Sequence, residues 1–257
     1  MTKTHNIKAK GADLFATETG KGPVIVFSHC LGLDHTVWDG VVDCLPNHRS
    51  IRYDLRGHGH SDVPDGPYSM GTLISDAEAV CDTLDLKDVV FVGLSVGGLI
   101  AQGLAVKRLD LVRGMVICAA AAKHGQPEPW HARAKAARDG GMAAVASGML
   151  ERWNPSDNST QLKDQLLRAS PEGFAATCEA IAGTDFYTPT SGLRLPTLGL
   201  CGTGDKATPP DLVRETTDLI HGSTFHLIKG AGHVAPLTHA EDFATRLIAF
   251  LTSIGHV

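Results

Sequence analysis

The feature that most constrains the fold is a regular alternation of short apolar runs with segments of helical periodicity. The apolar runs predict β-strands at 23–29, 50–54, 88–93, 111–118, 195–202 and 223–230. Helical patterns lie between or after them, at 70–84, 96–109, 209–220 and 241–251. Several runs are almost continuously apolar, as expected for strands buried on both faces of a parallel sheet. The alternation therefore predicts an α/β fold with a mostly parallel, doubly wound sheet, and the first twenty residues predict an antiparallel hairpin at one edge.

One stretch, residues 123–188, interrupts this alternation. It carries helical patterns but no convincing strand, and it lies between the predicted strands at 111–118 and 195–202. We interpret it as a helical cap that is inserted into the chain and covers the ends of the sheet. The sequence thus predicts an α/β core formed by residues 1–122 and 189–257, with a cap at 123–188.

Composition and charge exclude several classes of protein. The 257-residue chain carries a net charge of -5, which argues against a nucleic-acid surface and against an anionic membrane surface. No run of about 18 apolar residues occurs, and the first residues lack the apolar core of a signal peptide. The six cysteines form no CxxC pair, which indicates buried free thiols rather than disulfides or a zinc site. We expect a cytoplasmic protein without a nucleic-acid or membrane partner; its oligomeric state does not follow from the sequence.

Residues 92–98 read VGLSVGG and place Ser95 in a Gly-x-Ser-x-Gly pattern between a predicted strand and a predicted helix. A sharp turn there would leave the hydroxyl at the carboxyl ends of the strands, where open α/β sheets bind ligands. Gly93 and Gly97 would let the strand and the helix approach closely. The alternative is a glycine-rich helix start that Ser95 merely caps. The strand-turn-helix context favours a nucleophile.

A serine nucleophile needs a base and an acid, and in folds with this turn the chain order is serine, acid, histidine. Asp205 follows the strand-end Gly202 by three residues, and His233 follows the last predicted strand and a Gly-Ala-Gly turn. Taken singly, Asp205 could be a turn residue and His233 a surface histidine. Because both stand at strand ends in the required order, they predict a triad with Ser95.

Acyl transfer also requires an oxyanion hole. One backbone N–H donor should belong to Val96, directly after the nucleophile, and the other to the loop after an early strand, where Leu31 is the candidate. An ordinary strand-to-helix loop is the alternative for Leu31.

Other patterns give weaker signals. His58 and His60 in RGHGHSD could form a metal pair, but no third ligand is suggested nearby. The stretch at 202–209 is glycine-rich but lacks the P-loop spacing, and no GxGxxG follows the first strand. We therefore expect neither a metal nor an organic cofactor.

The motifs resemble those of the α/β-hydrolase superfamily, in family order over nearly the whole chain. They are HC at 29–30, YDLRGHGHSD at 53–62, GLSVGG at 93–98, CGTGDKATP at 201–209 and GAGHVAPLTHAEDF at 230–243. More narrowly, DLRGHGHSDVPDGPYSM at 54–70 and AAKHGQPEPWHARAKAARDGGMAAVASGMLERW at 121–153 are similar to 3-oxoadipate enol-lactonases. The resemblance implies an α/β-hydrolase fold with a helical cap, Ser95 as nucleophile, Asp205 as acid and His233 as base. It also implies a small carboxylated lactone as substrate, opened to 3-oxoadipate through an acyl-enzyme.

The chain departs from the pattern of these enol-lactonases at three places. His29 and Cys30 stand where the family commonly has Asn-Ser, Val96 where it usually has methionine, and Asn154 where it commonly has phenylalanine. These differences bear on the shape of the substrate pocket rather than on the triad.

The predicted cap also carries a feature that suits a carboxylate. Residues 123–153 hold five basic and three acidic side chains in a chain of net charge -5. Trp130 and Arg133 are three residues apart and would share a helix face, where a guanidinium beside an aromatic wall could bind a flat, carboxylated ring. Trp153 completes the candidate substrate-binding residues. The alternative is a solvated helix face over which Arg133 lies.

Other functions remain open. A carboxylesterase or a cofactor-free perhydrolase would use the same triad, and a non-catalytic ligand-binding protein could use the same fold. An intact triad argues against the last of these.

Overall fold

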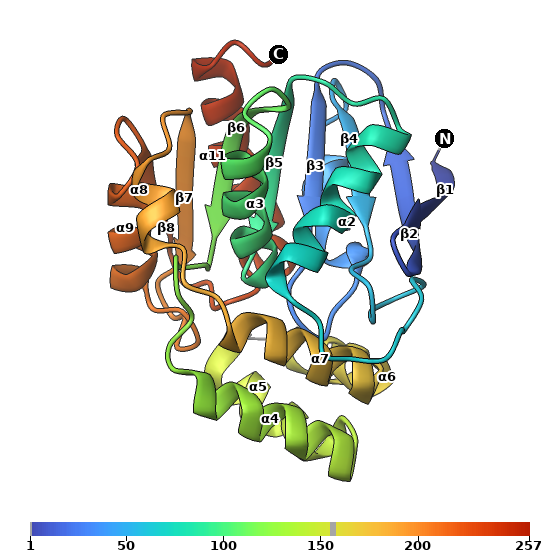
Figure 1. The fold of residues 1–257 in the computed structure, drawn as a ribbon. Coiled ribbons are helices and arrows are strands. Elements are labelled where there is room, and N and C mark those ends of the chain that lie inside the picture. Colours follow the sequence, from blue (N-terminus) through green and yellow to red (C-terminus); the bar gives the residue numbers. More distant parts are fainter. Residues whose placement is uncertain (1, 155–157) are drawn as a thin grey trace.

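An eight-stranded sheet forms the centre of the computed structural model, which describes residues 2–154 and 158–257 (Figure 1). The strand order is β1-β2-β4-β3-β5-β6-β7-β8. Its strands are β1 (Lys3–Ala9), β2 (Ala12–Thr19), β3 (Val24–Ser28), β4 (Arg49–Tyr53), β5 (Val89–Leu94), β6 (Val112–Cys118), β7 (Thr197–Gly202) and β8 (Thr224–Ile228). Strand β2 is antiparallel to both β1 and β4, and all other neighbours are parallel. The predicted mostly parallel sheet and its antiparallel edge hairpin are thereby confirmed.

Helices cover both faces of the sheet, which makes it doubly wound. Figure 1 shows α2 and α3 in front of the sheet and α11 behind it, where α11 packs against α1. The helices of this part are η1 (His35–Trp38, a 3₁₀ turn), α1 (Asp39–Asp43), α2 (Met70–Thr83), α3 (Val96–Lys107), α8 (Tyr187–Ser191), α9 (Pro210–Asp218), α10 (Ala235–Thr238) and α11 (Ala240–Ser253).

The central strands are buried on both faces, as their continuous apolar runs predict. Every residue of β5 and of β7 is buried, whereas most of the edge strand β8 is accessible to solvent. All six cysteines are free thiols, and all but the half-buried Cys44 are buried. The core therefore lies between the middle of the sheet and the helices on its two faces.

Four further helices lie together at the end of the sheet where the parallel strands finish (Figure 1). They are α4 (Pro127–Gly140), α5 (Ala143–Trp153), α6 (Ser159–Arg168) and α7 (Pro171–Ala182), and we call them the cap helices. Helix α4 packs on α7. Helix α7 in turn lies against the loop after β4, so closely that a Cβ on Gly173 would lie 2.0 Å from the carbonyl oxygen of Gly57. No strand occurs in the described part of 123–188. The cap helices thus cover the carboxyl ends of the parallel strands.

The histidines of RGHGHSD have structural contacts. His58 is 2% exposed, its Nδ1 donates to the carbonyl oxygen of Arg56 at 3.1 Å, and its ring centroid lies 5.4 Å from that of His29. The backbone N–H of His60 donates to Asp54 at 2.9 Å. No group of three or more potential metal ligands was found among residues 2–154 and 158–257. Burial lowers the pKa of His58 to about 4, so His58 is a neutral core histidine at neutral pH.

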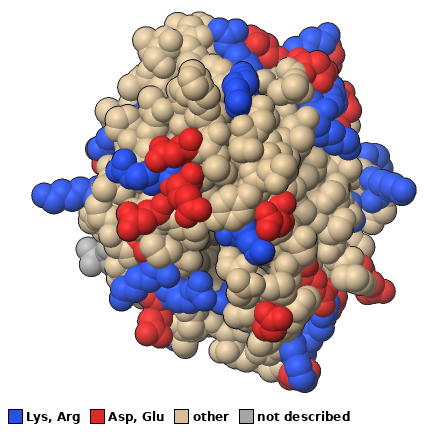
Figure 2. All heavy atoms as spheres, turned by 60° about the vertical axis from the view of Figure 1, so that its left-hand side comes forward, with Lys and Arg blue, Asp and Glu red and all other residues tan. Residues whose placement is uncertain are grey.

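Basic and acidic side chains are mixed over the molecular surface seen in Figure 2 rather than gathered by sign. Several of them pair, as Arg138 does with Glu172 and Glu179. None of the helices in the described ranges has the length and apolar character needed to cross a bilayer.

We predict that His58 makes the stability of the fold depend on pH. An unfolded histidine binds a proton near pH ~6.5, whereas native His58 does so only near pH 4. Between these values the unfolded state binds more protons, so the free energy of unfolding falls as the pH falls, by at most ~1.4 kcal/mol per pH unit from this residue. His58→Gln should flatten the slope by up to that amount in urea titrations between pH 4.5 and 6.5. His221→Gln, at an exposed histidine, is the control, and equal slopes for both variants would contradict the prediction.

Candidate active site

Ser95 stands at the junction of β5 and α3 in a backbone conformation that only the surrounding packing can hold. Its φ of 57° and ψ of -116° are costly for a residue with a side chain. The backbone N–H of Ser95 donates to the carbonyl oxygen of Cys118 at 2.8 Å. A Cβ on Gly93 would lie 2.1 Å from the carbonyl oxygen of Gly97, and one on Gly97 would lie 2.3 Å from that of Ser28. Both glycines are therefore required by the close approach of strand and helix.

Asp205 and His233 meet beyond the ends of β7 and β8. The Nδ1–H of His233 donates to Oδ2 of Asp205 at 2.8 Å. The other carboxylate oxygen, Oδ1, accepts the backbone N–H groups of Ala207 at 2.8 Å and Thr208 at 3.0 Å. These bonds fix the carboxylate and leave Nε2 of the neutral imidazole without a proton, which is the form a general base needs.

The last turn of α5 holds His233 in place. The N–H of His233 donates to the carbonyl oxygen of Trp153 at 2.8 Å, and the two rings stack at 6.0 Å between centroids with 15° between planes. Asn154, the next residue, has a φ of 49°, which asparagine tolerates better than phenylalanine, and its side chain donates to Gly204 at 3.1 Å. The departure at Asn154 thus follows from the way α5 ends beside the Asp205 loop.

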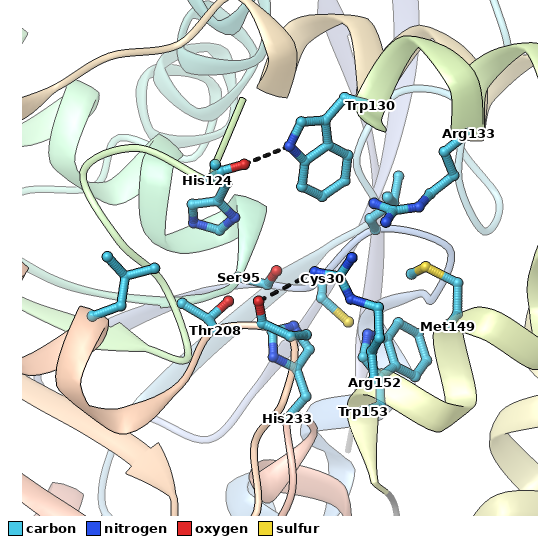
Figure 3. A pocket seen from close by; sticks show the side chains of 14 residues that line it. Cys30, Ser95, His124, Trp130, Arg133, Met149, Arg152, Trp153, Thr208 and His233 are labelled. Carbon is cyan, nitrogen blue, oxygen red and sulfur yellow. Dashed lines mark hydrogen bonds between the residues drawn. The ribbon is translucent and has the colours of Figure 1, made fainter. Parts of the chain in front are cut away.

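Ser95 and His233 line one cavity of about 140 Å³ between the strand ends and the cap helices (Figure 3). The residues that line it are Cys30, Leu31, Ser95, His124, Gly125, Trp130, Arg133, Met149, Arg152, Trp153, Ala207, Thr208, Leu212 and His233. The structure therefore brings Leu31, Trp130, Arg133 and Trp153 to the same cavity as the candidate nucleophile, with Asp205 behind His233. No hydrogen bond joins the Ser95 hydroxyl to another described residue, and such bonds often tighten only when substrate binds.

Leu31 and Val96 are the two expected oxyanion donors. Leu31 lines the cavity, Val96 is the first residue of α3, and neither N–H has an acceptor within the described ranges. The N-terminus of α3 also favours negative charge. His29 supports this loop, since its Nδ1 donates to Cys30 at 2.8 Å and its Nε2 accepts from the N–H of Leu55 at 2.9 Å. Burial raises the pKa of the Cys30 thiol well above its usual range, so Cys30 is not a competing thiolate nucleophile.

Two guanidinium groups face the cavity from α4 and α5. That of Arg133 lies 4.4 Å from the ring centroid of Trp130, and that of Arg152 donates to Ala207 at 3.4 Å. No described carboxylate forms an ion pair with either, whereas Arg138 pairs with two glutamates away from the cavity. Burial and the charge of Arg152 lower the pKa of Arg133. An anion bound near Arg133 would favour its charged form and so offset the lowered pKa.

The comparisons with known proteins identify the family. A sequence model of the alpha/beta hydrolase family matches residues 25–246. The chain belongs to this family. A 3-oxoadipate enol-lactonase of Acinetobacter baylyi is 31% identical over 99% of this hydrolase and 100% of its own length. An enol-lactonase from Burkholderia xenovorans LB400 superposes with a TM-score of 0.92 at 34% identity, over 96% of this chain and 100% of that one. A thermophilic esterase from Thermogutta terrifontis, solved with malate bound, superposes with a TM-score of 0.93 at 28% identity, over 99% and 100%.

Several residues of the hydrolase cavity carry no signal in the sequence. Met149, Thr208 and Leu212 line it only because their elements converge there. His124 also lines it, from the loop between β6 and α4, although nothing in its neighbours marks it as functional. Only its position in the stretch that is similar to enol-lactonases could have drawn attention to it.

We predict that Gly97→Ala will damage the fold of this hydrolase at the nucleophile turn. The added methyl would lie 2.3 Å from a backbone oxygen, so strand or helix must shift, at a cost of ~2 kcal/mol or more in the free energy of unfolding. Gly148→Ala on α5, where nothing lies within 4 Å, is the matched control and should stabilise by up to ~1 kcal/mol. Urea unfolding measures both, and equal stability of the two variants would refute the assigned strain.

Proposed function

We propose that this hydrolase cleaves esters and lactones through Ser95, and that its substrate is a small carboxylated enol-lactone of the 3-oxoadipate type. The observation that carries the proposal is the convergence of Ser95, the His233–Asp205 pair and two guanidinium groups on one small cavity. The first three residues supply the chemistry, and the two arginines supply a counter-charge for a carboxylate.

In the acylation step, Nε2 of His233 takes the proton of Ser95 as Oγ attacks the lactone carbonyl. Asp205 stabilises the imidazolium that forms, because its carboxylate already accepts the Nδ1–H. The carbonyl oxygen becomes an oxyanion, which the N–H groups of Leu31 and Val96 stabilise.

The ring C–O bond then breaks and His233 returns the proton to the departing enol oxygen. The enol rearranges to a ketone, which makes ring opening effectively irreversible. His233 next removes a proton from water, the hydroxide attacks the acyl-enzyme, and Ser95 leaves with the proton. The net reaction adds one water to the lactone and gives 3-oxoadipate. It requires no metal and no organic cofactor.

The charge of the cavity supports an anionic substrate. Arg133 is half-buried over Trp130 and is held near a second cation, an arrangement that is unfavourable unless an anion is bound. Two of the similar proteins described above are enol-lactonases, in agreement with such a substrate.

A carboxylesterase is the second candidate, since the esterase of Thermogutta terrifontis covers nearly the whole chain. A neutral ester would use the same triad and would leave both guanidinium groups without a partner. The charge dependence of turnover therefore separates the two candidates.

Ser95→Ala tests the nucleophile. Triad residues act as a unit, so turnover of the enol-lactone should fall by at least about 10³-fold, and labelling by a fluorophosphonate should disappear. Ser191→Ala, at an exposed serine of α8, is the control and should label normally. Labelling that persists in Ser95→Ala with activity intact would overturn the proposed function.

Arg133→Ala tests the carboxylate site. A charged hydrogen bond of this kind contributes ~1.5–3 kcal/mol, so kcat/KM for the carboxylated lactone should fall roughly 10- to 150-fold more than that for a neutral aryl ester. Arg133→Lys should restore only part of it, since lysine lacks the planar fork. Arg138→Ala, which removes a guanidinium already paired with Glu172 and Glu179, should leave the ratio unchanged. An unchanged ratio in Arg133→Ala would favour the carboxylesterase.

A further inference from the structure

A histidine that the proposed triad does not use faces the cavity close to the nucleophile. His124 lies in the loop between β6 and α4, and its imidazole points into the cavity on the side opposite His233 (Figure 3). Its Nε2 accepts the backbone N–H of Ala121 at 3.1 Å. Because a backbone N–H can only donate, Nε2 carries no proton. The proton of the neutral ring is therefore on Nδ1, which leaves a single N–H donor for the cavity.

His124 stays in this neutral form over the whole working range of a hydrolase. Burial lowers the pKa of His124 to about 3, and the nearby His233 lowers it as well. Its one lone pair is occupied by Ala121, so the ring cannot accept a proton from Ser95. His124 is thus a fixed hydrogen-bond donor and not a second base.

The loop that carries His124 is held from both sides. The indole N–H of Trp130 donates to the carbonyl oxygen of His124 at 2.5 Å. The N–H of Ala122 donates to Thr216 at 2.8 Å, and the carbonyl oxygen of Ala122 accepts the N–H of Phe186 at 2.8 Å. A donor that is fixed before substrate binds acts more effectively on a polar group than one that must be ordered.

The donor has a definite place along the wall of the cavity. Figure 3 shows His124 on one side of Ser95 and Arg133 on the other, with Trp130 between these two residues. The ring centroid of Trp130 lies 6.4 Å from that of His124 and 4.4 Å from the guanidinium of Arg133. The cavity measures only about 140 Å³, so a substrate that is attacked at Ser95 and anchored by its anion at Arg133 also lies against His124. The Nδ1–H of His124 would be left without an acceptor if the part of the substrate beside it were hydrocarbon.

We propose that the Nδ1–H of His124 binds an uncharged carbonyl oxygen in the acyl chain of the substrate. The inference rests on the proposed function, since it takes Ser95 as the point of attack. The inference adds one requirement to the proposed function, namely that the acyl chain carries a ketone. An enol-lactone meets this requirement because the oxygen that leaves the scissile carbonyl stays attached to the acyl chain and becomes its ketone.

A pair of neutral aryl esters isolates this contact from the arginines. The 4-nitrophenyl esters of 4-oxopentanoate and of pentanoate differ only in a ketone oxygen and carry no carboxylate. In the wild type, kcat/KM should be about 10-fold higher for the ketone ester. In His124→Leu the ratio should fall to near 1.

Two conservative variants separate substrate binding from support of the loop. His124→Asn can place an amide N–H near the former Nδ1 but gives up the contact with Ala121, and it should retain most of the ratio. His124→Gln can still accept from Ala121 through its amide oxygen, and it should behave like His124→Leu. Rescue by glutamine but not by asparagine, or an unchanged ratio in His124→Leu, would overturn the inference. A wild-type protein that is not labelled at Ser95 and hydrolyses neither ester would overturn the proposed function as well.

Discussion

The close approach of β5 and α3 is the constraint on which the rest of the site depends. Two glycines allow the carbonyl oxygens of Gly97 and Ser28 to lie where a side chain would otherwise be, and Ser95 is thereby forced to a φ of 57°. That conformation turns the hydroxyl away from both elements, toward the space beyond the strand ends. The same junction presents the N-terminus of α3, so the proposed nucleophile and one proposed donor for the oxyanion come from the same turn of backbone.

Helix α5 connects the proposed base, His233, with the wall of the cavity. One end of this helix carries Met149 and Arg152 into the cavity, and its last residue, Trp153, accepts the N–H of His233 and stacks on its ring. The loop of Asp205 is joined to the same place, since the N–H of Lys206 donates to the carbonyl oxygen of Arg152 at 3.1 Å. The orientation of the imidazole therefore depends on a helix that also shapes the substrate site.

The sequence predicts those parts of the site whose positions follow from neighbouring residues and from the order of the strands. The glycine spacing around Ser95 and the positions of Asp205 and His233 after buried runs are visible in the letters because each depends on its immediate neighbours. Trp130 and Arg133 share a helix face for the same reason. His124 could not be found in this way, because the charged groups around it come from distant parts of the chain, namely Arg152 of α5 and the loops that carry Asp205 and His233. The support that Trp153 gives His233 joins residues 80 positions apart, which no local pattern encodes.

The bond between Trp153 and His233 also bears on how such hydrolases diverge. If the cap helices only covered the cavity, exchanging them between relatives would be a simple route to new substrates. Here, a transplanted α5 must end with a carbonyl oxygen and a ring at the positions that hold the imidazole. Recombination within α4 leaves that connection intact, whereas a crossover inside α5 replaces it. Inherited diversity should accordingly concentrate in α4 and in the loops before it, and laboratory chimeras should place their junctions before Ala143.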